Sequence, residues 1–276
     1  MLKILLDAGH YGYQNQSPIY PQYYEAKQMW TLHLLLKKHL EANYEVEVGI
    51  TRDDQAKDLA VTTRGKLAKG YDLFLSLHSN AAKSESVDRV DVYYSYENLN
   101  NAKELAELFV EAISVCMGVD KGTAKTRKSK VGNWEYYGVL RGARSVGCPL
   151  FFIIEHSFHT NKNAAKWLMS DSNLDKLAKV EAEVIAEYFG LKAKTSGFNI
   201  GFRLLKNGTS GEDVRAYQYA LKGRGIKGAD GKTIATDGKF GSNTEHATKI
   251  LQRQFGLKDD GKAGPQTLTA AYTGTA

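Results

Sequence analysis

Apolar and polar positions along residues 1–191 follow two periods that alternate along the chain. Short apolar runs typical of buried strands are separated by longer segments whose apolar residues recur every three or four positions, as on one face of a helix. The strand-like runs are residues 2–6, 45–51, 71–77, 90–96 and 149–154, and the helix-like segments are residues 25–43, 59–70, 101–117 and 174–190. This order predicts an α/β domain with a twisted, mostly parallel sheet flanked by helices.

The periodic pattern stops after residue 191. Residues 192–201 show no clear period and carry small and polar side chains, so we interpret them as a linker. The pattern resumes in residues 202–276, which we expect to form a separate domain, because about 70 residues are enough to fold alone.

A repeated motif organises this C-terminal tail. DGKFGSNT at residues 237–244 and DGKAGPQT at residues 260–267 each place a Gly-rich turn before a helix-like segment. Pro265 suits the first turn of the helix that follows the second copy. Together with the helix-like residues 210–225, the repeats predict a small three-helix domain.

Composition places the chain among soluble globular proteins, with 42% hydrophobic and 25% charged residues over 276 positions. No N-terminal leader with an apolar core and cleavage site is present, and no apolar stretch is long enough to span a membrane. We therefore expect synthesis in the cytoplasm without a signal peptide and no membrane insertion. Cys116 and Cys148 lack CxxC spacing and are expected to be reduced, buried thiols.

The net charge of +6 belongs mostly to the tail, where 12 Lys and Arg stand against 7 Asp and Glu from residue 201 onward. Such a charge favours an anionic partner, for example a wall polymer, although ordinary surface lysines explain it equally well. No basic stripe interleaved with aromatic residues is present, so we expect no nucleic-acid binding.

Two histidines stand where strand-like runs end. In LLDAGHYG, residues 5–12, an apolar run stops and His10 follows between two glycines. In YDLFLSLHSN, alternation places His78 on one face with Phe74 and Ser76. Strand ends at one edge of an open α/β sheet are where functional groups gather. Taken alone, His10 is more simply explained as a polar loop residue, so a site depends on its partners.

Glu25 begins the first helix-like segment and continues an apolar stripe made by Met29, Leu32 and Leu36. Its carboxylate is therefore expected to tip toward the core, where an unpaired charge is costly. A metal ion is one way to pair that charge. The alternative is a favourable interaction with the helix dipole in the first turn.

His10, Glu25 and His78 would supply three ligands and leave a fourth tetrahedral position open, which is how catalytic zinc is held. A structural zinc site is normally closed by four ligands and rich in cysteine, and the chain has only two cysteines. Water at the open position would have its pKa lowered to roughly 7 and act as a nucleophile. These residues therefore predict a catalytic zinc site.

A proton carrier is the further requirement, and PLFFIIEHSFHTN, residues 149–161, offers Glu155 at the end of a strongly apolar strand. Burial there would raise the pKa of Glu155 toward the useful range. His156 and His159 are alternative metal ligands if they lie on one helical face. The strand-like pattern argues against these two histidines as ligands, because alternation along a strand points His156 away from Glu155.

The motifs LLDAGHYG, TRDD, LFLSLHSN, YGVLRGA and IIEHSFHTN, together with Glu25, resemble in order and spacing the zinc-dependent N-acetylmuramoyl-L-alanine amidases of bacteria and phage endolysins. The resemblance spans nearly all of residues 1–190. It implies the zinc amidase fold, Zn²⁺ as the cofactor, zinc ligation by His10, Glu25 and His78, and Glu155 as the catalytic glutamate. Many relatives carry a small residue where this chain has His156, so a role for His156 stays open.

The tail resembles a three-helix peptidoglycan-binding module through LKNGTSGEDVRAYQYAL and the two repeats. The resemblance as a whole implies hydrolysis of the amide between the lactyl group of N-acetylmuramic acid and L-alanine in peptidoglycan. It also implies a monomer that acts on the bacterial cell wall after release, like an endolysin, although an enzyme made in a lysing mother cell would look the same. Two alternatives are a zinc peptidase cutting within the stem peptide and a non-catalytic wall-binding protein, which would not need the metal triad.

A basic and aromatic stretch, KGTAKTRKSKVGNWEYYG at residues 121–138, is too irregular for a core element. We expect it to border the substrate groove, with Arg127 and Lys128 attracting acidic groups and Trp134 or Tyr137 packing on the substrate. A solvated loop is the equally weighted alternative.

Overall fold

The computed structural model describes residues 1–194 and 203–274, and the chain divides into two compact units, residues 1–196 and 197–276. The predicted linker lies mostly outside the described residues, so its boundaries stay a prediction. The strands of the first unit are β1 (Leu2–Ala8), β2 (Val46–Ile50), β3 (Leu73–Asn80), β4 (Arg89–Tyr93), β5 (Asp120–Lys125) and β6 (Leu150–Phe158). Its helices are α1 (Glu25–Asn43), α2 (Val61–Lys66), the 3₁₀ helix η1 (Leu99–Asn101), α3 (Ala102–Met117), α4 (Gly138–Ser145), α5 (Lys162–Leu168) and α6 (Asp171–Tyr188).

The six strands form one mixed sheet in the order β2-β1-β3-β6-β4-β5. β1 is parallel to β2 and β3, β3 is parallel to β6, and β4 is parallel to β5, whereas β4 and β6 are antiparallel. The prediction of a mostly parallel sheet is confirmed. Because β1, β3 and β6 are adjacent and parallel, their carboxyl ends meet at one edge of the sheet.

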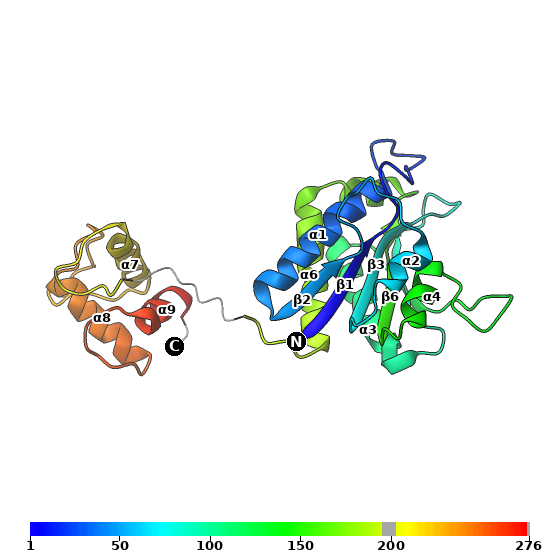
Figure 1. Ribbon diagram of the computed structural model, residues 1–276. Coiled ribbons are helices and arrows are strands. Elements are labelled where there is room, and N and C mark those ends of the chain that lie inside the picture. The colour runs from blue at the N-terminus through cyan, green and yellow to red at the C-terminus, as the bar shows by residue number, and fades with distance from the viewer. Residues whose placement is uncertain (195–202, 275–276) are drawn as a thin grey trace. The chain divides into compact units, whose positions relative to one another are not determined.

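Helices cover both faces of this sheet, with α1 and α6 on one side and α2 and α4 on the other (Figure 1). Alternation along the strands divides the apolar side chains between two cores. Leu75 and Phe152 belong to the core under α1, α3 and α6, while Phe74 and Phe151 belong to the core under α2 and α4. The face of Phe74 is therefore the face that Ser76 and His78 share.

Periodicity predicted the long elements and the short β2, α2 and β4, but it missed β5, α4 and α5. Helix α1 has the bounds that the pattern predicted. Strand β5 lies at the sheet edge and its sequence DKGTAK has no apolar alternation. Helix α4, GVLRGARS, contains two glycines, which lower helix propensity. Their formation depends on tertiary packing, which a local pattern does not show.

A bulge interrupts β6 directly after the site residues. His78 is paired with Glu155, but Asn80 is paired with Phe158, so β6 contains one extra residue. Ser157 takes up this residue with a left-handed backbone, φ 61°. Bulges of this kind re-aim side chains next to functional sites.

Within residues 203–274, the second unit contains three helices, α7 (Glu212–Gly223), α8 (Ser242–Gln254) and α9 (Pro265–Thr273), as the sequence predicted. Pro265 is the first residue of α9. The helices share a core with the residues that flank them, formed by Leu205, Val214, Tyr217, Leu221, Ile226, Ile234, Phe240, Ala247, Leu251, Ala263, Leu268 and Ala271.

The two sequence repeats of this unit form the same hydrogen-bond network. The Gln218 amide nitrogen donates to Asp237 Oδ1 at 3.0 Å and to the Lys239 carbonyl oxygen at 2.9 Å. The Gln252 amide makes the equivalent bonds at 3.0 Å and 2.9 Å in the second repeat, to Asp260 and Lys262. A buried glutamine therefore fixes each Asp-Gly-Lys turn.

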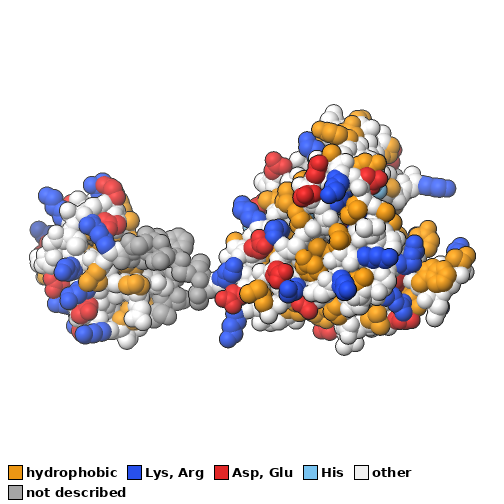
Figure 2. All heavy atoms as spheres, viewed as in Figure 1, with side chains coloured by type: hydrophobic (Ala, Val, Ile, Leu, Met, Phe, Trp, Pro, Cys, Tyr) orange, Lys and Arg blue, Asp and Glu red, His pale blue; other side chains and the backbone are white. Residues whose placement is uncertain are grey.

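Basic and acidic side chains are interspersed over the visible face of each unit rather than gathered into one basic stripe (Figure 2). Within residues 1–194 and 203–274, every helix is too short or too polar to span a lipid bilayer. Cys116 and Cys148 are both buried free thiols, as predicted.

Candidate metal and acid–base site

The candidate site lies at the carboxyl edge of the sheet, where β1 and β3 end beside the start of α1. His10 follows β1, His78 lies near the carboxyl end of β3, and Glu25 is the first residue of α1. Glu25 is fully buried, in line with the buried Met29 and Leu32, as the stripe predicted. Three segments that are far apart in the sequence thus deliver two imidazoles and one carboxylate to one point.

The turn after β1 depends on close approach of its backbone to His78. A Cβ on Gly9 would lie 2.5 Å from His78 Nδ1 and 2.8 Å from the Leu77 carbonyl oxygen, which no larger residue tolerates. His10 then adopts a left-handed backbone with φ 57°. A non-glycine residue in this region indicates local strain that the surroundings maintain, and such strain is common at functional sites.

The donor atoms of His10, Glu25 and His78 all lie within 4.8 Å of one another. Glu25 Oε1 is 2.9 Å from His78 Nδ1, and Glu25 Oε2 is 3.5 Å from His10 Nε2. Burial opposes ionisation of Glu25, but the hydrogen bond and charge of His78 outweigh it and hold the pKa of Glu25 below its ordinary value. The cluster therefore combines an ionised carboxylate with two imidazoles, which is a donor set that suits a divalent metal ion.

A buried chain of polar groups orients the ring of His78. The Ser76 hydroxyl donates to Asp7 Oδ2 at 2.7 Å, so its oxygen accepts from Nε2–H of His78 at 3.1 Å. Nδ1 is then the ring nitrogen that faces Glu25, and Nδ1–H donates to Glu25 Oε1 at 2.9 Å. Metal-binding histidines are commonly held in this way by a second hydrogen bond.

Asp7 itself is fully buried and paired. Arg64 Nη1 donates to its Oδ2 at 3.1 Å, and the Thr51 hydroxyl donates to its Oδ1 at 2.6 Å. Sequence reasoning named neither Asp7 nor Arg64 as site residues. The available signal in the sequence was the acidic residue Asp7 directly after a strand-like apolar run.

Glu155 lies beside this cluster, because β6 places it in register with His78 of β3. Its Oε2 atom is buried and has no hydrogen-bond partner among the residues that the structure describes. Burial raises the pKa of Glu155 to about 7, with His78 opposing the rise and the charges of Glu25 and Asp91 adding to it. A carboxyl group that titrates near neutral pH is suited to move a proton.

His156 and His159 lie outside the donor cluster. His156 Nδ1–H donates to the His78 carbonyl oxygen at 2.9 Å, and Nε2 pairs with the buried Glu181 of α6. His159 Nδ1 is 3.0 Å from the Ser79 carbonyl oxygen and 3.8 Å from Glu25 Oε2. Both rings thus border the cluster. His156 is hydrogen-bonded to the backbone of His78, and His159 lies near the carboxylate of Glu25.

The stretch 121–138 is part strand and part loop, and its last two residues border the site. Tyr137 and Gly138 line a pocket together with His78 and Glu155. Arg127 stacks on Tyr136, with its guanidinium carbon 3.6 Å from the ring centre. Glu135 is buried and accepts from the Ser95 hydroxyl at 3.0 Å, so the segment is anchored rather than wholly solvated.

Trp134 does not line this pocket. It borders a separate hollow of about 460 Å³ with Thr62, Lys66, Arg141, Arg144 and Ser145.

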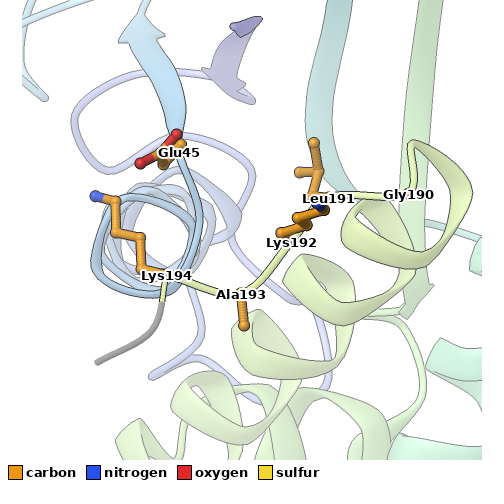
Figure 3. A pocket seen from close by; sticks show the side chains of 6 residues that line it. All are labelled: Glu45, Gly190, Leu191, Lys192, Ala193 and Lys194. Carbon is orange, nitrogen blue, oxygen red and sulfur yellow. The ribbon is translucent and has the colours of Figure 1, made fainter. Parts of the chain in front are cut away.

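Another hollow, of about 680 Å³, lies away from the sheet edge that carries the site. It is lined by Glu45 and by residues 190–194, shown as sticks in Figure 3. None of these residues is a histidine or a member of the donor cluster. The chemistry of the molecule is therefore assigned to the strand ends and not to this larger hollow.

Comparison with known proteins agrees with the two units. Residues 4–187 match the family described as N-acetylmuramoyl-L-alanine amidase, and residues 210–271 match a family described as a peptidoglycan binding domain. The endolysin of Bacillus phage SPP1 is 30% identical over 163 residues, which are 59% of this chain and 57% of that protein. The chain therefore spans little more than half the length of this relative.

Two further likenesses each cover part of the chain. The zinc D-Ala-D-Ala carboxypeptidase of Streptomyces albus G is 41% identical over 68 residues, which are 25% of this chain and 26% of that enzyme. The catalytic domain of CwlV, an amidase from Bacillus (Paenibacillus) polymyxa, has a TM-score of 0.59 at 21% identity and covers 70% of this chain and 100% of that domain. This structural likeness shows the fold.

Proposed function

The chain belongs, through residues 4–187, to the N-acetylmuramoyl-L-alanine amidase family, and on this premise we propose that it hydrolyses the amide between N-acetylmuramic acid and L-alanine in peptidoglycan. The observation that carries the proposal is the meeting of His10, Glu25 and His78 within 4.8 Å. Glu155 beside them completes the set that an amide hydrolase needs. A non-catalytic wall-binding protein would not need this arrangement.

We propose that the metal held there is zinc, with His10, Glu25 and His78 as its ligands. The donor set fits, because the buried carboxylate of Glu25 faces two ring nitrogens, and the hydrogen bond between His78 Nε2 and Ser76 leaves Nδ1 as the nitrogen that could bind a metal ion. When bound, zinc would supply Lewis acidity, which polarises a carbonyl group and makes water a better nucleophile at neutral pH.

Glu155 is the proposed proton carrier. Its buried carboxylate would accept the proton of the attacking water and deliver it to the departing amide nitrogen, which becomes the free amine of L-alanine. A pKa of about 7 allows Glu155 to serve in both directions near neutral pH. Asp7, Ser76 and Arg64 would hold His78 in the tautomer that the site requires.

We further propose that the tail binds peptidoglycan and concentrates the enzyme on the wall. The phage endolysin among the relatives supports action at the cell wall after release from the cytoplasm. We expect the protein to act as a monomer.

Product analysis tests the proposal directly. Purified walls are digested, and reducing ends, free amines and the identity of the new N-terminal residue are measured, with the zinc content of the enzyme determined beforehand. New L-alanine amino termini without new reducing ends are expected. A new amine on any other residue would instead identify a peptidase that cuts within the stem peptide, and no release at all would leave a wall-binding protein.

A further inference from the structure

The hollow of about 460 Å³ beside Trp134 is separate from the pocket at Glu155, although helices α2 and α4 line both of them (Figure 1). The pocket takes Val61 and Val139 from these helices, whereas the hollow takes other residues of each. A volume of this size lies in the range of ligand-binding sites. The lining of the hollow combines an indole, two hydroxyls and three cations, from Trp134, Thr62, Ser145, Lys66, Arg141 and Arg144.

Two glycines bring α2 and α4 into backbone contact below this hollow. A Cβ on Gly65 would lie 2.0 Å from the Val139 carbonyl oxygen, and a Cβ on Gly142 would lie 2.3 Å from the Thr62 carbonyl oxygen. Only glycine permits so close an approach. The contact fixes the spacing between the α2 side chains and the α4 side chains that line the hollow.

Trp134 lies on a loop that hydrogen bonds hold in place. The Tyr96 hydroxyl donates to the Asn133 carbonyl oxygen at 3.0 Å, and the Ser129 N–H donates to the Trp134 carbonyl oxygen at 2.9 Å. A Cβ on Gly132 would lie 2.1 Å from the indole, so the ring packs on the backbone of this glycine. Trp134 is nevertheless 44% exposed. A fixed, exposed indole is suited to stack on the C–H face of a sugar ring.

Two of the three cations have no acidic partner within the described part of the chain. Arg144 is paired, because its Nη2 lies 2.6 Å from Glu97 Oε2. Lys66 forms no ion pair with any described residue, and Arg141 uses only Nη1, which donates to two carbonyl oxygens of the preceding loop at 3.0 Å and 2.6 Å. Nε and Nη2 of Arg141 stay available, and a guanidinium presents such N–H groups in a fork that matches a carboxylate.

An aromatic ring beside unpaired cations suits an acidic sugar better than a phosphate-linked polyol, which offers charge without a ring face. The proposed reaction creates an acidic sugar. Water supplies a hydroxyl to the lactyl carbonyl carbon and a proton to the departing nitrogen, the C–N bond breaks, and the acid that forms ionises at neutral pH. In the intact strand the same carbonyl belongs to a neutral amide. This charge on the sugar is therefore present only after cleavage.

Resting on the proposed function, we infer that the hollow is a second binding site, which holds the cleaved glycan strand. A sugar ring stacks on Trp134, and the lactyl carboxylate of the strand pairs with Arg141 and Lys66. The sugar side of the product thus stays on the enzyme while the peptide leaves. The site distinguishes a cleaved strand from an intact one by the charge that hydrolysis creates.

Calorimetry on the full chain tests the site with two oligosaccharides of alternating N-acetylglucosamine and N-acetylmuramic acid. One has free lactyl carboxylates, and in the other these are methyl amides, which keep the rings and remove the charge. Chelator prevents turnover. The acid form is expected to bind about tenfold more tightly than the amide form at low ionic strength, since two charge contacts are gained. Added salt should reduce this preference.

Variants of the lining separate stacking from charge. Trp134→Ala should raise the Kd of both oligosaccharides about fivefold, and Trp134→Phe should restore most of the loss. Lys66→Gln should raise the Kd of the acid form alone, by about threefold. The matched control is Lys166→Gln, because Lys166 is an exposed lysine of α5, a helix that packs on the opposite side of the sheet. The tail is the same in every protein, so its own binding cancels from each comparison.

Two results would overturn the inference. One is an equal Kd for the acid and amide forms in wild-type protein, and the other is a Kd that neither Trp134→Ala nor Lys66→Gln changes. A phosphate-bearing wall polymer is the third ligand. If it binds more tightly than the acid oligosaccharide and only its binding is weakened by Lys66→Gln, the hollow takes another class of polymer and the inference also fails.

The proposed function has a separate readout, the release of L-alanine amino termini from walls. Binding of the acid form that is weakened in Trp134→Ala and Lys66→Gln supports the site even if no hydrolysis is detected, in which case the proposed function alone fails. Hydrolysis at the expected amide together with equal binding of the two oligosaccharides removes the site and leaves the function intact.

Discussion

The Nδ1 atom of His156 lies 2.9 Å from the main-chain carbonyl oxygen of His78, so an imidazole of β6 is hydrogen-bonded to the backbone of the candidate metal donor on β3. On its other side the ring pairs through Nε2 with Glu181 of α6, and both side chains are fully buried. His156 therefore links the helix layer to the sheet at the position of the site. We therefore expect a positioning role for His156 rather than a place among the donors.

Loss of the Glu181 carboxylate should destabilise the first unit. Glu181→Leu leaves His156 buried without its partner, so we expect the free energy of unfolding to fall by about 3 kcal/mol or more. The matched control is Glu183→Leu on the same helix, because Glu183 is exposed and only 3.8 Å from Lys179 in a surface pair. Its effect should stay within about 0.5 kcal/mol. Urea unfolding measures both, and equal losses would contradict the positioning role.

The two glutamates of the site should respond differently to substitution. Glu25→Ala removes a proposed metal donor, so zinc affinity and thermal stability should both drop. Glu155→Gln keeps the donors, so the protein should retain stoichiometric zinc and near-native stability while kcat falls by about 100-fold or more. Zinc is measured on the same preparation before kinetics, because partial metal loss would mimic a catalytic defect. Zinc loss in Glu155→Gln with zinc kept in Glu25→Ala would exchange the two roles.

The metal-free protein should reveal the raised pKa of Glu155 through its stability. Burial raises this pKa to about 7 from an ordinary value of 4.5. Between these pH values the folded state holds one proton more than the unfolded state, so stability falls as pH rises from 4.5 to 7 and levels off above. Relative to Glu155→Gln, wild-type protein in chelator should lose about 3 kcal/mol over this window. Parallel stability profiles for the two proteins, measured by urea unfolding, would refute the shift.

The glutamines of the tail should contribute equally to its stability. Gln218 and Gln252 are buried and hold equivalent turns through equivalent bonds. Replacement of either by Ala leaves buried turn groups unsatisfied, at a cost of about 2 kcal/mol in the unfolding of this unit. Gln266→Ala, at an exposed position of α9, is the control. Calorimetry of the full chain follows the tail transition, and an unchanged transition in Gln252→Ala would show that the network is dispensable.

The two units should be separable. The backbone N–H of Lys194 donates to the Asn43 carbonyl oxygen, so a fragment must extend past residue 194. Residues 1–196 should stay folded, bind zinc and hydrolyse soluble muropeptides, but lose most of their affinity for intact walls. Wall co-sedimentation compares the fragment with the full chain. A fragment that sediments as completely as the full chain would remove the targeting role of the tail.

Local pattern alone determined the elements that carry the donors. The spacing of apolar residues predicted α1 from residue 25 to residue 43 and put Glu25 on its buried stripe. Strand alternation put Phe74, Ser76 and His78 on one face, and the structure bears this out. These features depend on contacts between residues a few positions apart, so the sequence contains them directly.

Tertiary structure decided which side chains meet. His156 pairs with Glu181, which lies 25 residues further along the chain on α6. Asp7, on another strand, orients His78 through Ser76. Val61 and Tyr137 line the pocket beside Glu155. Each pairing depends on strand order, on the register between β3 and β6 and on the helix that covers the face. Because these contacts join residues far apart in the sequence, no local period encodes them. Only the packed fold brings the candidate donors, Glu155 and the pocket to one edge of the sheet.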